Sequence, residues 1–195
     1  MKRLCVFCGA NAGTRPEYGA SARELSAALA RRGLGLVYGG GNVGLMGMLA
    51  DAMLHAGGEV IGVIPQHLVA REVAHRGVTR LHVVEDMHQR KAMMNELSDA
   101  FVALPGGFGT LEEFFEILTW SQLGIHRKPS GLLNVSGYYD DLLAMLDHAV
   151  TQGFLLPANR KLVIADTDAD ALVQRLASLC TASTEQDANA AGNFL

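Results

Sequence analysis

Three glycine-rich turns are the segments of this sequence best suited to hold an anion. CGANAG, YGGGNVG and LPGGFGT each follow or close a short apolar run, at residues 8–13, 38–44 and 104–110. Glycine lets backbone N–H groups approach a ligand closely, and a helix that starts after the turn adds partial positive charge. In an open parallel sheet such turns lie at the carboxyl ends of the strands, where ligands bind. The three turns together predict a phosphate-bearing ligand.

Glu113, directly after the third turn, has two possible roles. Thr110 and Glu113 have the spacing of a capping box, T-x-x-E, which would account for both without any function. In a helix over 110–123 one apolar stripe consists of Leu111, Phe114, Phe115 and Leu118, while Glu113 shares a second face with Ile117 and Trp120. One face would meet a sheet and the other a second subunit, so we expect a homodimer. Glu113 either caps the helix or faces a cleft.

Arg90 poses a similar question on another helix. In EDMHQRKAMMNEL, Asp86 and Gln89 form a cap pair, and Arg90 lies on the apolar stripe that follows, with Lys91 beside it. An arginine on a buried face needs an anionic partner. The alternative is a partly solvated arginine whose aliphatic stem packs on the core.

The second turn contains G-x-G-x-x-G, at Gly39, Gly41 and Gly44. A dinucleotide site would place this motif after the first strand and an acidic residue at the end of the next one. Here the motif follows the second strand, and the next strand runs into proline. Glu59 has a suitable sequence distance but stands at the beginning of that strand. The motif therefore does not predict NAD binding.

The chain alternates short apolar runs with helical patterns. The expected strands are LCVFC, LGLVY, EVIGVI, RLHVV, AFVAL, GLLNV and KLVIA, and the expected helices cover about 15–32, 43–56, 87–98, 110–123, 138–151 and 168–180. Several strands are apolar at successive positions, as strands buried on both faces are. This pattern predicts a single α/β domain, with a Rossmann-like, doubly wound, mainly parallel sheet and helices on both faces.

Composition narrows the class of protein. The chain has 195 residues, 49% hydrophobic and 18% charged, with a net charge of −4. We expect no nucleic-acid partner, because there is no broad basic stripe, and no membrane span, because no apolar run reaches about 18 residues. The apolar N-terminus ends in glycine and asparagine too soon for a signal peptide, so we interpret it as a first strand and expect a cytoplasmic protein.

Two features are interpreted without function. Cys5 and Cys8 form a CxxC but have no second pair, so we take them as small buried hydrophobic residues. Residues 181–195 are polar and alanine-rich and are expected to form a flexible tail after a domain of residues 1–180.

The connection over about 65–78 has no clear periodicity, and long connections in compact domains are often functional.

Several segments together resemble a known family. MHQRKAMM, LPGGFGTLEE, TWSQLGIHRKP and GLLNVSGYYD closely resemble the Lonely Guy family of cytokinin riboside 5′-monophosphate phosphoribohydrolases, many of which carry the older label "lysine decarboxylase-like". The resemblance covers about residues 2–180, and its P-G-G-x-G-T-x-x-E motif is specific. It implies a Rossmann-like fold and hydrolysis of the N-glycosidic bond of an N6-modified AMP, releasing the base and ribose 5-phosphate.

The resemblance also implies roles for single residues. Arg90 and Glu113 would be the catalytic pair. Substrate contacts would come from Glu72, Lys91, Gly107, Phe108, Gly109, Thr110, Leu111, Glu112 and Thr119, and from Gly40 and Gly41 in the second turn. Gly107 to Thr110 would hold the 5′-phosphate. The implied chemistry requires neither a metal nor a redox cofactor.

Two alternatives remain at this stage. A non-catalytic carrier of a nucleotide or cofactor would keep the glycine turns but would not need the Arg–Glu pair. A pyridoxal-dependent decarboxylase would need a Schiff-base lysine, and none of Lys2, Lys91, Lys128 and Lys161 stands in a supporting pattern. The preferred base, isopentenyl-adenine or plain adenine, is not determined by the sequence.

Overall fold

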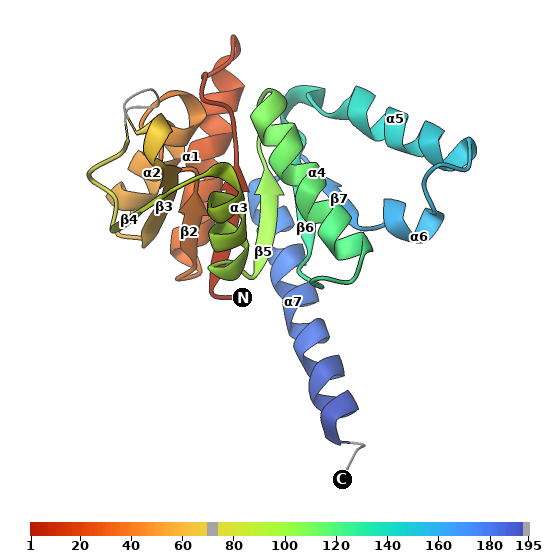
Figure 1. Ribbon diagram of the computed structural model, residues 1–195. Coiled ribbons are helices and arrows are strands. Elements are labelled where there is room, and N and C mark those ends of the chain that lie inside the picture. The colour runs from red at the N-terminus through yellow and green to blue at the C-terminus, as the bar shows by residue number, and fades with distance from the viewer. Residues whose placement is uncertain (70–73, 193–195) are drawn as a thin grey trace.

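A fully parallel sheet forms the centre of the molecule (Figure 1). The structure, a computed structural model, describes the backbone of residues 1–69 and 74–192, and side chains up to residue 182. The strands are β1 (Arg3–Phe7), β2 (Gly35–Tyr38), β3 (Val60–Pro65), β4 (Arg80–Val84), β5 (Ala100–Ala103), β6 (Ser130–Leu133) and β7 (Val163–Asp166). Their order is β4-β3-β2-β1-β5-β6-β7, and neighbouring strands pair in parallel.

Helices cover both faces of this sheet, which confirms the predicted doubly wound α/β class. One layer consists of α1 (Pro16–Arg31), α2 (Gly44–His55) and α7 (Ala169–Gly192), and the other of α3 (Met87–Glu96), α4 (Phe108–Gln122) and α5 (Asp140–Thr151). Three short helices, η1 (Gln66–Leu68), η2 (Val135–Gly137) and α6 (Pro157–Arg160), lie in connections. Each layer encloses its own hydrophobic core against the sheet.

Alternate residues along β1 and at Cys8, directly after it, pack in the two cores. Leu4, Val6 and Cys8 pack with the first layer, and Cys5 and Phe7 with the second. The two cysteines of the CxxC are therefore buried on opposite faces of the sheet, and both are free thiols. Burial raises the pKa of each thiol. The interpretation of Cys5 and Cys8 as buried hydrophobic residues is confirmed.

The start of α4 differs from the expectation. The helix begins at Phe108, and Gly107 occupies the N-cap without a side-chain hydrogen bond. Thr110 is already the third helical residue, so the capping-box alternative for Thr110 and Glu113 does not hold. The reason is that the glycine turn enters the helix directly, two residues before the threonine. On α3, by contrast, the Asp86 carboxylate does accept a hydrogen bond from the backbone N–H of Gln89, 2.8 Å away.

The C-terminal helix is longer than predicted. The backbone of α7 continues to Gly192, whereas the sequence pattern placed the end of the last helix near residue 180. Figure 1 shows it extending well beyond the sheet. Flexibility of the segment 181–195 stays a prediction, and residues 193–195 lie outside the described part. Among the described residues, no helix combines the length and the apolar character that crossing a membrane requires.

The strand order creates one crevice at the carboxyl edge of the sheet. From β1 the chain moves outward to β2, β3 and β4, and from β5 it moves outward in the other direction to β6 and β7. The connections that leave β1 and β5 therefore diverge, although the two strands are neighbours. Ligands of open α/β sheets bind at such a switch point.

Candidate active site

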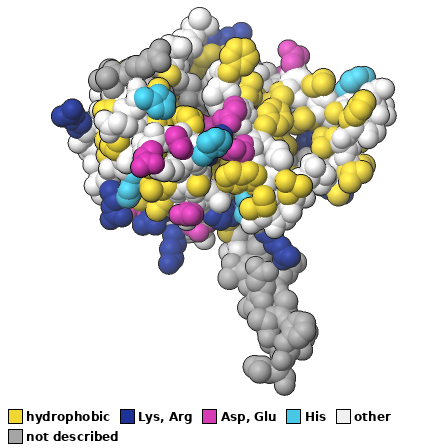
Figure 2. Space-filling model, viewed as in Figure 1, with side chains coloured by type: hydrophobic (Ala, Val, Ile, Leu, Met, Phe, Trp, Pro, Cys, Tyr) yellow, Lys and Arg dark blue, Asp and Glu magenta, His cyan; other side chains and the backbone are white. Residues whose placement is uncertain are grey.

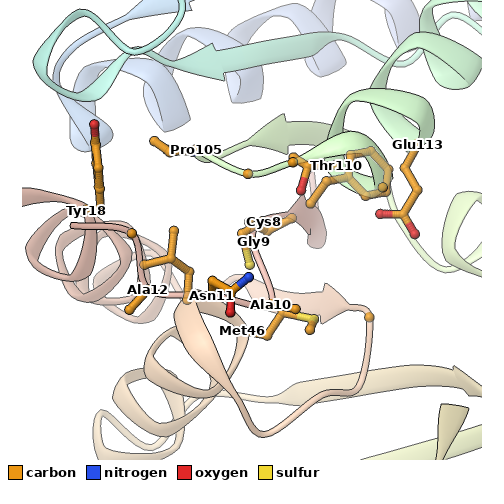
Figure 3. A pocket seen from close by; sticks show the side chains of 18 of the residues that line it. Cys8, Gly9, Ala10, Asn11, Ala12, Tyr18, Met46, Pro105, Thr110 and Glu113 are labelled. Carbon is orange, nitrogen blue, oxygen red and sulfur yellow. The ribbon is translucent and has the colours of Figure 1, made fainter. Parts of the chain in front are cut away.

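A cavity of about 450 Å³ lies at this switch point (Figure 3). All three predicted glycine-rich turns contribute to its wall. The lining residues come from the turn after β1 (Cys8, Gly9, Ala10, Asn11, Ala12, Gly13), from the turn after β2 and the start of α2 (Gly39, Leu45, Met46), from the turn after β5 and α4 (Pro105, Gly106, Gly107, Gly109, Thr110, Glu113), and from Val6, Phe7, Tyr18, Leu68, Met87, Arg90 and Tyr138. The volume suits a ligand of nucleotide size.

The first turn of α4 offers an anion site. Gly107, Gly109 and Thr110 line the cavity at the helix N-terminus, where first-turn N–H groups have no partner within the helix. Beyond the adjacent residues and the backbone of the helix itself, a Cβ atom added to Gly107 or Gly109 would meet no described atom within 4 Å. Packing inside this chain therefore does not require glycine at these positions. Their small size instead leaves open space in front of the positive end of a helix.

Arg90 and Glu113 face each other across this cavity, from α3 and α4. Both side chains are buried, and Arg90 Nη2 lies 3.7 Å from Glu113 Oε1. Figure 3 shows the Glu113 carboxylate pointing into the cavity beside Thr110. The predicted catalytic residues are thus brought together one helical turn from the candidate anion site.

Gly39 determines where the Arg90 guanidinium lies. Arg90 Nη2 donates a hydrogen bond to the Gly39 carbonyl oxygen at 3.2 Å, and Nη1 lies 3.6 Å from the sulfur of Met87. A Cβ atom on Gly39 would come within 2.1 Å of Nη2. The first glycine of the G-x-G-x-x-G motif thus makes room for an arginine. Arg90 Nε is buried and has no hydrogen-bond partner among the described residues, so it remains available for a ligand.

The charges of Arg90 and Glu113 also act on Cys8, which lines the cavity. Burial raises the pKa of the Cys8 thiol, the Glu113 carboxylate raises it further, and Arg90 opposes the effect. Cys8 is therefore a neutral thiol at physiological pH. It shapes the apolar wall and does not supply a thiolate nucleophile.

Lys91, Glu112 and Glu116 form a separate cluster beside the cavity. Lys91 Nζ lies 2.5 Å from Glu112 Oε1 and 3.0 Å from Glu116 Oε2, which connects α3 to α4. Burial lowers the pKa of Lys91, but its hydrogen bonds with Glu112 and Glu116 outweigh this effect and leave the pKa raised. Lys91 and Glu112, both expected to contact substrate, do not belong to the cavity lining of this chain.

Three further residues of α4 that the resemblance implied also lie outside the lining. Phe108 is 95% exposed at the helix start, and Leu111 packs partly on the second core. The exposed Thr119 hydroxyl donates a hydrogen bond to the Phe115 carbonyl oxygen at 2.7 Å. Their proposed substrate contacts stay predictions.

Gly40 and Gly41 lie behind Gly39 rather than at the cavity. Gly40 has a φ of +76°, and its carbonyl oxygen accepts a hydrogen bond from the backbone N–H of His75 at 2.9 Å. Gly41 forms an isolated bridge with Ala74. These contacts hold the turn that positions Arg90. Glu72, the remaining predicted contact, lies outside the described residues.

Sequence reasoning missed a group of lining residues. CGANAG had been recognised as a ligand-type turn, but none of its residues was assigned to the site. Tyr18, Met46, Met87 and Tyr138 line the cavity as well, and no local pattern marks them. Only the position of GLLNVSGYYD among the matching segments could have drawn attention to Tyr138.

Comparison with known proteins shows the family of this chain. Residues 46–176 match the family model described as "Possible lysine decarboxylase". A cytokinin riboside 5′-monophosphate phosphoribohydrolase of Rhodococcoides fascians is 54% identical over 178 residues, covering 91% of this chain and 90% of that protein. One from Arabidopsis thaliana is 51% identical over 176 residues, covering 90% and 81%.

The chain belongs to the cytokinin riboside 5′-monophosphate phosphoribohydrolase family. The resemblance to the Lonely Guy family drawn from the sequence is confirmed. The match to the family model covers residues 46–176, and this range includes both helices that carry Arg90 and Glu113.

Solved structures at lower identity share the fold. The molybdenum cofactor carrier protein of Chlamydomonas reinhardtii is 24% identical and has a TM-score of 0.68, covering 91% of this chain and 98% of that one. The molybdenum cofactor binding protein of Rippkaea orientalis is 23% identical, with a TM-score of 0.67. These likenesses concern the Rossmann-like architecture alone.

Proposed function

We propose that this protein hydrolyses the N-glycosidic bond of N6-modified adenosine 5′-monophosphate, or of AMP itself, and releases the free base and ribose 5-phosphate. One observation carries the proposal. Arg90 and Glu113 face each other in a single cavity, one helical turn from a helix N-terminus that can hold a phosphate. Relatives named for this reaction on cytokinin nucleotides, about 50% identical to this chain, support it.

The helix start binds the 5′-phosphate in this proposal. Backbone N–H groups from Gly107 to Thr110 and the positive end of α4 face the anion. The phosphate does not react, so its binding energy serves to orient the ribose toward Glu113.

Glu113 acts on the ribose. Departure of the base builds positive charge on the sugar, an oxocarbenium-like state that a nearby carboxylate stabilises. Water attacks C1′ as the bond from C1′ to the base nitrogen breaks, and the carboxylate can take the proton of that water. In the balanced reaction, hydroxyl ends on C1′ and one proton ends on the base.

Arg90 orients the nucleotide and stabilises the leaving group. Its guanidinium is held by a hydrogen bond to the Gly39 carbonyl oxygen. The free Nε donor can bond an acceptor of the base or the ribose, and the positive charge favours electron density that moves onto the departing base.

Two other functions are less well supported. A pyridoxal-dependent decarboxylase needs a lysine at the reacting centre, but no lysine belongs to the described lining of the cavity, and Lys91 is engaged by Glu112 and Glu116. A carrier of a nucleotide or cofactor would use the same crevice. It would not require a buried carboxylate aimed at the ribose position.

A second copy of this chain is the partner that we propose for the outer face of α4 and α5. Figure 2 shows hydrophobic side chains gathered over these helices and α6. The exposed ones are Leu123 and Ile125 directly after α4, Met145 on α5, and Phe154 and Leu156 between α5 and α6, and Phe154 is 91% exposed. Clusters of this kind mark interaction sites. Sedimentation at micromolar concentration tests the homodimer, and a monomeric mass would contradict it.

The cellular location proposed here is the cytoplasm. Cys5, Cys8 and Cys180 are free thiols, which is usual in a reducing compartment. Cell fractionation would test this assignment.

A substrate assay tests the reaction directly. The protein is incubated with AMP and with N6-isopentenyl-AMP, and free base is measured by chromatography. We expect base and ribose 5-phosphate in equal amounts from at least one substrate. If neither substrate yields base, the proposed reaction is wrong.

A further inference from the structure

The three carbonyl groups of the turn before α4 are each held by a hydrogen bond from outside the turn. The Tyr139 hydroxyl donates to the Leu104 carbonyl oxygen at 2.7 Å, and the Gly9 backbone N–H donates to that of Pro105 at 3.1 Å. The Tyr138 hydroxyl donates to the Gly106 carbonyl oxygen at 2.6 Å. This arrangement leaves the backbone N–H groups as the donors that the turn can present to an anion.

The peptide between Gly106 and Gly107 is the peptide of this turn that has glycine on both sides. Glycine on both sides permits a wide range of backbone angles, and Gly107 has open space around it. Because the peptide is planar and trans, its C=O and N–H point in opposite directions. The hydrogen bond from Tyr138 to the Gly106 carbonyl therefore also fixes the direction of the Gly107 N–H.

The neighbouring tyrosine has no such effect on a donor. The peptide whose carbonyl Tyr139 holds is followed by Pro105, which has no N–H. Leu104 is in addition anchored by its own N–H, which donates to the Phe7 carbonyl oxygen at 2.9 Å. Tyr139 is buried, and its hydroxyl satisfies a carbonyl in the core. Two adjacent hydroxyl groups thus differ in whether they orient a backbone donor.

The connection after β6 places Tyr138 at the cavity. Since β6 pairs with β5, the turns that follow these strands lie side by side. The Asn134 side chain accepts a hydrogen bond from the Tyr139 N–H at 2.7 Å, and Ser136 adopts a φ of +51°. Tyr138 itself lines the cavity, and its ring meets that of Tyr18 edge to face at 5.8 Å.

We propose that Tyr138 is the positioning residue that gives this site its selectivity for a 5′-phosphate, by holding the Gly106–Gly107 peptide with its N–H available to the anion. Without the hydroxyl the peptide can turn, and its carbonyl oxygen would then repel a phosphate. The inference rests on the proposed function, because it assigns the α4 start to the phosphate.

Tyr138→Phe tests the proposal, since the substitution removes the hydroxyl and keeps the ring contacts. We expect the KM for AMP to rise about tenfold and kcat to stay within about threefold. The kcat/KM for adenosine, which has no phosphate, should be unchanged within about twofold, and Tm should shift by less than about 2 °C. A change that was merely structural would affect both substrates equally.

A binding measurement separates this inference from the proposed reaction. Calorimetric titration of the wild-type protein with ribose 5-phosphate and with ribose needs no turnover. In Tyr138→Phe we expect the Kd for ribose 5-phosphate to rise about tenfold, with ribose unaffected. If AMP were not hydrolysed but this result appeared, the reaction would be wrong and the role of Tyr138 would stand.

Tyr139→Phe is the matched control. We expect it to lower Tm, because it leaves a buried carbonyl without its donor, and to keep the ratio of AMP to adenosine turnover within about twofold of wild type. The proposal is overturned if Tyr138→Phe binds ribose 5-phosphate as tightly as wild type, or if Tyr139→Phe weakens that binding as much as Tyr138→Phe does.

Discussion

Two neighbouring cations of α3, Lys91 and Arg90, pair with glutamates of α4 at different distances. Lys91 is held by Glu112 and Glu116 at 2.5 and 3.0 Å, whereas Arg90 and Glu113 stand 3.7 Å apart. Both glutamates near Lys91 have solvent access, while Arg90 and Glu113 are buried, with the Nε donor of Arg90 unused among the described residues.

The difference separates two roles within one pair of helices. The close contacts between buried Lys91 and its two more exposed glutamate partners fix the distance between α3 and α4. In the longer, buried pair, Arg90 Nε has no hydrogen-bond partner among the described residues, and buried donors of this kind are normally satisfied, which leaves this donor for a ligand. In the proposed function, Arg90 and Glu113 act on the substrate, whereas their neighbours Lys91 and Glu112 hold the two helices together. Substitutions can test this division.

Glu113→Gln should have the largest effect. The amide keeps the shape of the side chain but cannot take a proton or stabilise a cationic sugar, so we expect kcat to fall about 10³-fold. Base release from AMP or N6-isopentenyl-AMP measures this loss.

Glu116→Gln is the control for that measurement, one turn further along the same helix. It leaves Lys91 paired with Glu112, and we expect activity within about twofold of wild type. Full activity in Glu113→Gln would remove Glu113 from the mechanism even if the reaction itself were correct.

Gly39→Ala should have the next largest effect, although Gly39 belongs to neither α3 nor α4. The new methyl group would displace the Arg90 guanidinium, since it would come within 2.1 Å of Nη2. A shift of about 1 Å at a catalytic group can cost about 10² in rate, and we expect a loss of that order in kcat. Tm should change little, because the end of a flexible side chain can move. Unimpaired turnover would show that the position of Arg90 is not critical.

Lys91→Met should affect stability more than chemistry. Loss of the pairs with Glu112 and Glu116 should cost about 1 kcal/mol, and Tm should fall by about 2–4 °C in a domain of this size. Thermal denaturation measures this change, and KM for AMP should stay within about threefold. A tenfold rise in KM at unchanged Tm would instead show that Lys91 contacts the substrate, as the family resemblance implied.

The pH dependence of the same variant should give the smallest effect. Because the folded pKa of Lys91 lies above its ordinary value of 10.5, its ion pairs stabilise fully below that pH and fail as pH rises through the raised pKa. The difference in unfolding free energy between wild type and Lys91→Met should be constant from about pH 6 to 9 and shrink above about 10.5. A difference that grew with pH would contradict this assignment.

Local patterns were sufficient for most of the fold. Runs such as LGLVY and AFVAL became central strands because they are apolar on both faces. The cap on α3 was predictable, since Asp86 bonds the N–H of Gln89. The start of α4 was not, because T-x-x-E has the composition of a capping box while the preceding glycines begin the helix earlier.

The site was only partly predictable. PGGFGT and Glu113 are separated by a few residues, so one helix start carries both. The packing of α3 on α4 decides which side chains reach the cavity. It brings Arg90 and Glu113 together there and keeps Lys91 out of the lining. Tyr138 enters the site through the pairing of β6 with β5, a contact between segments about 30 residues apart that no local spacing reveals.

The order of strands also has a consequence for folding. After β4, at one edge of the sheet, the chain returns past β3, β2 and β1 to form β5 in the middle. Arg90 lies within this crossover, and Glu113 lies beyond it. The pair that we propose to be catalytic therefore cannot form in the first half of the chain alone, and contacts of long sequence separation form slowly. Recovery of activity during refolding would report the closing of this crossover, and with it completion of the whole domain.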